Sequence, residues 1–104
     1  MLRRKPLTIR ELKSTIAKIA TEYELERVIL FGSYANGKQN RKSDIDLLVS
    51  FLSKTKKPVT YFTILDLQER IEEMTGKKVD VIPAPIPKDS LLEIGKEVLL
   101  YEAG

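Results

Sequence analysis

Residues 30–51 read LFGSYANGKQNRKSDIDLLVSF, and this stretch decides the fold. It begins inside a short apolar run, residues 27–31, which a glycine terminates as is typical of a buried strand. After a polar interval, a second strand-like run begins at Asp44 and ends at Phe51. The pattern predicts two neighbouring strands joined by a polar loop, and Asn36-Gly37 suits a tight hairpin turn within that loop.

The second run places two carboxylates on one face of a strand. Successive strand side chains point to opposite faces, so Asp44 and Asp46 lie on the same face, about 7 Å apart along the backbone. The other face is uniformly apolar and should be the core side: Ile45, Leu47, Val49 and Phe51. Two like charges on one face repel, so something positive must be shared between them. A divalent cation with oxygen ligands is the simplest candidate, and Mg²⁺ is the usual one where phosphates are present.

The glycine that ends the first strand predicts an anion site. Gly32 lets the backbone approach a ligand closely, and the N–H groups of a following turn attract anions, while Ser33 adds a hydroxyl donor. The loop that follows carries Lys38, Arg41 and Lys42. Each of these cations is more often a solvated loop residue than a phosphate contact. The functional alternative places one of them over a triphosphate, where it offsets charge in the transition state.

Composition limits the remaining chemistry. With 104 residues the chain should form a single domain over 1–104, with a flexible tail at 1–7. Because it contains neither Cys nor His, disulfides, thiolate metal sites, histidine bases and Ser-His triads are excluded. The net charge of +3 is small and unclustered, so no direct nucleic-acid binding is expected. With no signal peptide and no bilayer-length apolar segment, we expect a cytoplasmic chain without membrane association.

Periodicity predicts two helices outside the opening stretch. Thr8 and Glu11 have the spacing of a capping box, and the apolar residues after them predict a helix over 9–23. A second helix is predicted over 61–75 and ended by Gly76, with its methionine and aromatic positions in the core.

The C-terminal part of the chain is predicted to hold two strands and a short helix. A strand spans 78–83, and a helix capped by Asp89 or Ser90 ends at Gly95. Residues 97–101 suit a final edge strand or more helix, and we favour the strand.

The strand at 78–83 carries one acid, Asp80. A lone acid in a strand more often faces water at a strand end than takes part in catalysis. If this strand pairs in register with the second one, however, Asp80 lies beside Asp44 and Asp46, because adjacent strands are less than 5 Å apart. The three acids would then form one cluster.

These residues resemble a known family. Gly32-Ser33, ten residues, then Asp44-Ile45-Asp46 resembles the signature of the polymerase-beta-like nucleotidyltransferases. The whole chain resembles their smallest members, the minimal nucleotidyltransferases (MNT) found as antitoxin partners of HEPN-domain toxins. One departure is Asn36, where relatives commonly carry a basic residue. The resemblance implies an α+β fold, a small mixed β-sheet with helices packed on one face.

The resemblance also implies a reaction. Asp44 and Asp46 would hold two Mg²⁺ ions roughly 3.5–4 Å apart, and Asp80 would ligate one of them and is a candidate to accept the proton. Gly32 and Ser33, with Lys38 or Arg41, would bind the triphosphate of ATP. Attack on the α-phosphorus would transfer AMP and release pyrophosphate. Since the chain has no residues left for an acceptor domain, the implied acceptor is a tyrosine of a HEPN toxin.

Three alternatives remain open at this point. The chain could be a non-catalytic antitoxin that masks its toxin, although three repelling acids argue against a retired site. It could transfer a nucleotide to a small hydroxylated compound, as a homo-oligomer whose second subunit completes the pocket. It could also be a small α+β domain whose acids lie at solvent-exposed strand ends.

Overall fold

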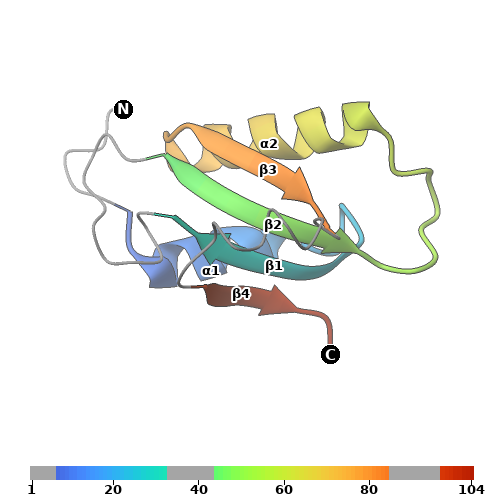
Figure 1. The fold of residues 1–104 in the computed structure, drawn as a ribbon, viewed down its shortest axis with the longest axis horizontal. Helices are drawn as coiled ribbons and strands as arrows, with labels where there is room; N and C mark the ends of the chain where they lie inside the picture. The colour runs from blue at the N-terminus through green and yellow to red at the C-terminus, as the bar shows by residue number, and fades with distance from the viewer. Residues whose placement is uncertain (1–6, 33–43, 85–96) are drawn as a thin grey trace.

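The computed structural model describes residues 7–32, 44–84 and 97–104, which form a four-stranded sheet and two helices (Figure 1). The elements in chain order are α1 (Ile9–Ile19), β1 (Leu25–Phe31), β2 (Ile45–Phe51), α2 (Tyr61–Thr75), β3 (Val79–Pro83) and β4 (Val98–Glu102). The sheet order is β3-β2-β1-β4; β2 and β3 are parallel and the other two pairs are antiparallel. Both helices lie on the same face of the sheet. The predicted α+β architecture with a mixed sheet is confirmed.

Strict alternation in β2 separates the core from the other face of the sheet. Ile45, Leu47 and Val49 are fully buried, whereas Asp46 and Ser50 are partly exposed. The neighbouring strands and both helices contribute to the same core, whose largest buried side chains also include Leu12, Ile16, Ile19, Leu25, Val28, Leu30, Leu67 and Ile71. The two faces predicted for β2 are therefore the two faces of the whole sheet.

Helix α1 begins where the sequence predicts. The Glu11 N–H donates to Thr8 Oγ1, and the Thr8 N–H donates to Glu11 Oε1, each at 3.0 Å. These two bonds form the predicted capping box and satisfy N–H groups that have no partner within the helix. Leu7, which the prediction placed in the tail, is buried against the core.

The predicted end of α1 at Tyr23 is wrong, because the helix ends at Ile19. The chain then turns into β1: the Leu25 N–H donates to the Ala20 carbonyl oxygen at 2.9 Å, and Glu24 adopts a φ of 55°. The apolar period continues past the helix because Tyr23, in the turn, still packs against the core. Hydrophobic spacing alone therefore could not locate this helix end.

Helix α2 has the predicted bounds, and Gly76 ends it with a φ of 69°. The prediction that its methionine and aromatic positions are core is wrong, since Tyr61, Phe62 and Met74 are 72%, 78% and 37% exposed. The core arc of the helix is set by Ile64, Leu67, Ile71 and Thr75. At 3.6 residues per turn, Tyr61 and Met74 lie on the flanks of that arc and Phe62 lies opposite it.

Strands β3 and β4 confirm the two predicted C-terminal strands, each within one residue of its predicted bounds, and both are edge strands. The helix predicted after Asp89 or Ser90, the turn predicted at Asn36-Gly37 and most of the predicted tail lie outside the described residues. Within the part of the chain that the structure describes, no helix is long and apolar enough to span a membrane.

Candidate active site

The end of β1 meets the start of β2, because the two strands are antiparallel. Phe31 and Asp46 are register partners, so Gly32 follows directly beside that acid. Gly32 has a φ of 80°, and a Cβ atom added there would collide with the Asp46 carboxylate. Glycine is therefore required for two separate reasons, the left-handed backbone and the close approach of a side chain.

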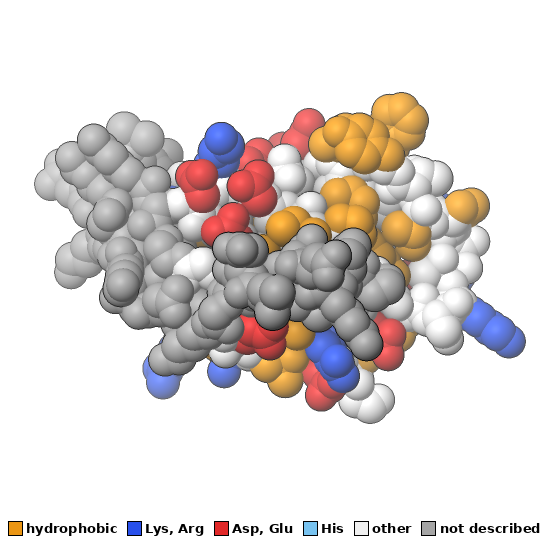
Figure 2. All heavy atoms as spheres, viewed as in Figure 1, with side chains coloured by type: hydrophobic (Ala, Val, Ile, Leu, Met, Phe, Trp, Pro, Cys, Tyr) orange, Lys and Arg blue, Asp and Glu red, His pale blue; other side chains and the backbone are white. Residues whose placement is uncertain are grey.

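Strand β3 brings the third acid to the same place. In the parallel β2–β3 pairing, Asp46 and Asp80 are register partners. Side chains of register partners on adjacent strands point to the same face and are neighbours. Figure 2 shows acidic side chains gathered over the starts of β2 and β3. The register on which the predicted three-acid arrangement depends is thus present in the fold.

Of the three acids, Asp46 is the one whose pKa is affected by both of the others. The pKa of Asp46 is raised above its ordinary value, first by partial burial and then by the negative charges of Asp80 and Asp44. Asp44 and Asp80 themselves are exposed. A carboxylate that is partly desolvated and repelled by two others is one that a nearby cation would stabilise.

The donor set fits a hard divalent cation, since such ions prefer carboxylate oxygens. The three acids lie at one end of the sheet, on the face opposite the core. Over residues 7–32, 44–84 and 97–104, no three acidic side chains are already arranged as a metal cage. The side chains of Asp44 and Asp80 are exposed, and exposed side chains change rotamer rapidly.

The remaining predicted site residues, Ser33, Lys38 and Arg41, lie outside the described residues. Their contacts with a triphosphate therefore stay predictions. Gly32 is the part of the predicted anion site that the structure describes.

Two side chains that sequence reasoning did not single out lie next to this site. Glu72 and Gln68 on α2 accept hydrogen bonds from the backbone of β3, through Oε2 from the Val79 N–H at 3.0 Å and through Oε1 from the Val81 N–H at 3.2 Å. Their four-residue spacing on the flank of a helix was the sequence feature that could have drawn attention to them.

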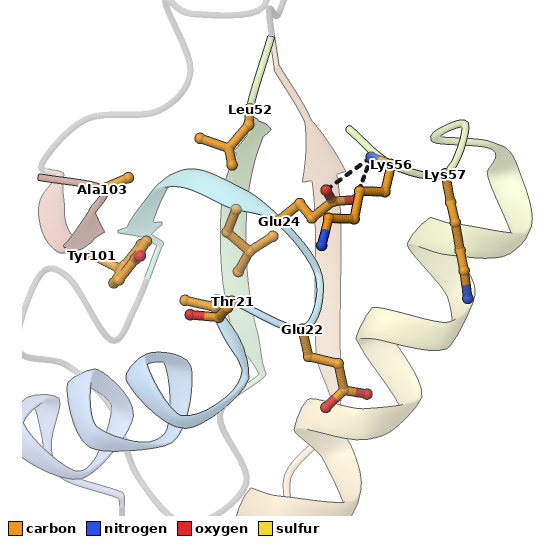
Figure 3. A pocket seen from close by; sticks show the side chains of 10 residues that line it. Thr21, Glu22, Glu24, Leu52, Lys56, Lys57, Tyr101 and Ala103 are labelled. Carbon is orange, nitrogen blue, oxygen red and sulfur yellow. Dashed lines mark hydrogen bonds between the residues drawn. The ribbon is translucent and has the colours of Figure 1, made fainter. Parts of the chain in front are cut away.

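A hollow of about 400 Å³ lies at the other end of the sheet, where the α1–β1 turn meets the residues that follow β2 and the end of β4 (Figure 3). In its wall, Glu24 accepts hydrogen bonds from the Lys56 N–H at 2.8 and 3.1 Å. These bonds join the β2–α2 connector to the α1–β1 turn. Of the predicted site residues that the structure describes, namely Gly32, Asp44, Asp46 and Asp80, none lines this hollow.

Comparison with known proteins identifies the family. Residues 14–102 match the family model described as Polymerase beta, Nucleotidyltransferase. The chain belongs to this family. A candidate protein adenylyltransferase of Methanocaldococcus jannaschii is 34% identical over 97 residues, which cover 89% of this chain and 100% of the relative. Protein adenylyltransferase MntA of Thermococcus cleftensis is 26% identical over 80 residues, covering 73% of this nucleotidyltransferase-family chain and 77% of MntA.

Solved structures agree on the fold of this nucleotidyltransferase-family chain. A chain from the complex of a tri-AMPylated Shewanella oneidensis HEPN toxin with an MNT antitoxin superposes with a TM-score of 0.65 at 17% identity, over 92% of this chain and 74% of that one. A candidate minimal nucleotidyltransferase gives a TM-score of 0.61 at 27% identity, over 83% of this chain and 88% of that one. The predicted resemblance to the minimal nucleotidyltransferases is therefore confirmed.

Proposed function

We propose that residues 1–104 form a Mg²⁺-dependent protein adenylyltransferase that transfers AMP from ATP to a tyrosine of a HEPN toxin and so acts as its antitoxin in the cytoplasm. The observation that carries the proposal is the placement of Asp46, which has Asp80 as its register partner, Asp44 two residues before it and Gly32 against its carboxylate. The choice of acceptor is supported by relatives named protein adenylyltransferases and by the HEPN–MNT complex among the similar folds.

In this proposal, Asp44, Asp46 and Asp80 hold two Mg²⁺ ions. When bound, the ions would neutralise charge on the triphosphate and lower the pKa of the acceptor hydroxyl. Because Gly32 has no Cβ atom, the Asp46 carboxylate lies directly against the backbone that would approach the triphosphate. Ser33, with Lys38 or Arg41, donates hydrogen bonds to phosphate oxygens and orients the α-phosphorus.

The reaction is one displacement at phosphorus. The tyrosine oxygen forms a bond to the α-phosphorus, the bond from that phosphorus to the bridging oxygen breaks, and pyrophosphate leaves with the electron pair. Asp80 is exposed and accepts the tyrosine proton. Because the acids hold and orient the reactants, the protein's own contribution is positioning and electrostatics.

The decisive experiment follows the label of α-³²P-ATP after incubation of the protein and Mg²⁺ with a HEPN toxin from the same organism. Label should appear on the toxin, disappear with Asp46→Asn and persist with Glu69→Gln, which removes an exposed acid from α2 as a control. Asp46→Asn should still bind the toxin but fail to neutralise it. Full neutralisation by Asp46→Asn would instead support masking by binding, and label on a small hydroxylated compound alone would support the small-molecule transferase.

A further inference from the structure

The outer side of β3 is completed by a helix rather than by another strand. As the last strand of the sheet, β3 pairs with β2 on one side. On the other side, the N–H groups of alternate residues would lack partners at an open edge. Here the N–H groups of Val79 and Val81 donate to Glu72 and Gln68, and both bonds are partly buried.

The spacing of these bonds matches the two elements to each other. Gln68 and Glu72 are four residues apart, which is about 6 Å along a helix. Val79 and Val81 are two residues apart, which is about 6.6 Å along a strand. Both bonds therefore form at once in a single alignment, and sliding β3 along α2 would break them together.

The residue between the two bonded amides is Asp80. Its strand is held by β2 on the inside, where Asp46 is its register partner, and by α2 on the outside. An edge strand of only five residues would otherwise fray readily. The helix thus contributes to fixing the distance between the second and third carboxylates.

We infer that Glu72 and Gln68 are positioning residues that hold Asp80 where it can share a cation with Asp46. This inference rests on the proposed function, in which Asp80 is a metal ligand. Removing a group that hydrogen-bonds directly to a metal ligand typically changes metal affinity by about 10–100-fold. Because Glu72 and Gln68 bond the backbone on either side of Asp80 instead, we expect an effect at the lower end of that range. A role limited to closing the sheet edge would affect stability alone.

The test compares variants that remove the acceptor oxygen with variants that keep it. Gln68→Met and Glu72→Met preserve side-chain length and helix propensity but cannot accept the bond. Gln68→Glu and Glu72→Gln retain an acceptor oxygen at the same position. Glu73→Met changes an exposed acid of the same helix, and Ile64→Val lowers stability from within the core arc.

Two measurements are made on each full-length variant. Amide hydrogen exchange reports directly on Val79 and Val81, and calorimetry with Mg²⁺ and a non-hydrolysable ATP analogue reports the metal affinity. Gln68→Met should exchange faster at Val81 and Glu72→Met at Val79, and each variant should bind Mg²⁺ about tenfold more weakly. The acceptor-keeping variants, Glu73→Met and Ile64→Val should bind Mg²⁺ like the parent protein.

Faster exchange at the amide that has lost its acceptor, with unchanged Mg²⁺ affinity, would overturn the inference and leave only the edge-closing role. An equal loss of affinity in Ile64→Val would also overturn it, because a general loss of stability would then explain the effect. If the parent protein takes up no Mg²⁺ with the nucleotide, the proposed function fails as well, so the two failures are distinguishable.

Discussion

Replacing Gly32 with alanine would place a methyl group against the Asp46 carboxylate while keeping the backbone at a φ of 80°. The backbone term alone costs roughly 1–2 kcal/mol for a residue with a Cβ atom in the left-handed region. Moving the Asp46 side chain away from the methyl group into a poorer rotamer adds about 0.5–1.5 kcal/mol. The free energy of unfolding should therefore fall by about 1.5–3.5 kcal/mol.

Gly76 offers a matched control for the backbone term. It also has a positive φ, 69°, but a Cβ atom added there would meet nothing within 4 Å. Gly76→Ala should therefore lose about 1–2 kcal/mol of stability and keep its activity. Gly32→Ala should lose more stability and, because a displacement of about 1 Å at a reacting group can cost 10²-fold in rate, about 100-fold in AMP transfer.

Circular dichroism during heating measures the loss of stability. Initial rates of label transfer to the partner, taken well below the melting temperature, measure the loss of AMP transfer. For a domain of this size each 1 kcal/mol corresponds to about 4–8 °C in Tm. The reasoning would be refuted if Gly32→Ala and Gly76→Ala lost equal stability and Gly32→Ala remained active, since the collision with Asp46 would then have no consequence.

Three further predictions concern charge and ligands. Because the folded state raises the pKa of Asp46, its ionised form destabilises the fold at neutral pH, and Asp46→Asn should raise Tm at pH 7. This gain should be absent at a pH below the unfolded-state pKa near 3.8, where Asp46 is protonated in both states. Heating curves of the variant and the parent protein at pH 7 and pH 3 measure the difference. Mg²⁺ with ATP at 100 times the Kd should add about 2.7 kcal/mol to the free energy of unfolding and so raise Tm, and chelating the metal should reverse the rise. An unchanged Tm in the parent protein would contradict the metal site. The Tyr23 hydroxyl donates a hydrogen bond of 2.8 Å to Asp66, which should contribute about 1 kcal/mol to stability. Burial and Asp66 raise the pKa of Tyr23 to about 12, so this contribution should be present below pH 10 and lost as the pH rises through about 12. An ultraviolet titration that loses its component near pH 12 in Tyr23→Phe, and not in the exposed Tyr61→Phe, would verify this assignment.

The two acids at the start of β2, Asp44 just before it and Asp46 within it, could be predicted from sequence because their relation is local. A spacing of two residues in a strand fixes the shared face of Asp44 and Asp46 whatever the rest of the chain does. The place of Asp80 depends on a parallel register, and parallel strands need a crossover whose packing a sequence pattern does not specify. From sequence, the place of Asp80 beside the other acids could therefore be predicted only on the condition that its strand pairs in register with β2. In the structure, the β2–β3 pairing and the hydrogen bonds from β3 to α2 fix the position of its strand.

Other features escaped prediction because a pattern of apolar residues does not reveal what a side chain meets. Tyr23 keeps the helical spacing although the helix has ended, since a tight turn also brings its apolar side chain to the core. Tyr61 and Phe62 look like core residues by type, yet their angular positions on α2 leave them exposed. There the two rings pack edge to face, with their centroids 6.4 Å apart. Gln68 looks like an ordinary surface residue until the edge of β3 is placed beside it.

The position of β2 inside the sheet explains how the fold keeps Asp46 close to two other carboxylates despite their repulsion. β2 is an inner strand, paired with β1 on one side and β3 on the other, so its backbone cannot move away from the repulsion at Asp46. On either side of Asp46, Ile45 and Leu47 are fully buried on the opposite face, and each contributes about 1.5–3 kcal/mol by leaving water. The apolar residues at odd positions thus fix the acids at even positions. The same two-residue period that defines the core therefore keeps Asp46 within the electrostatic influence of Asp44 and Asp80, which is the arrangement that the proposed cation site needs.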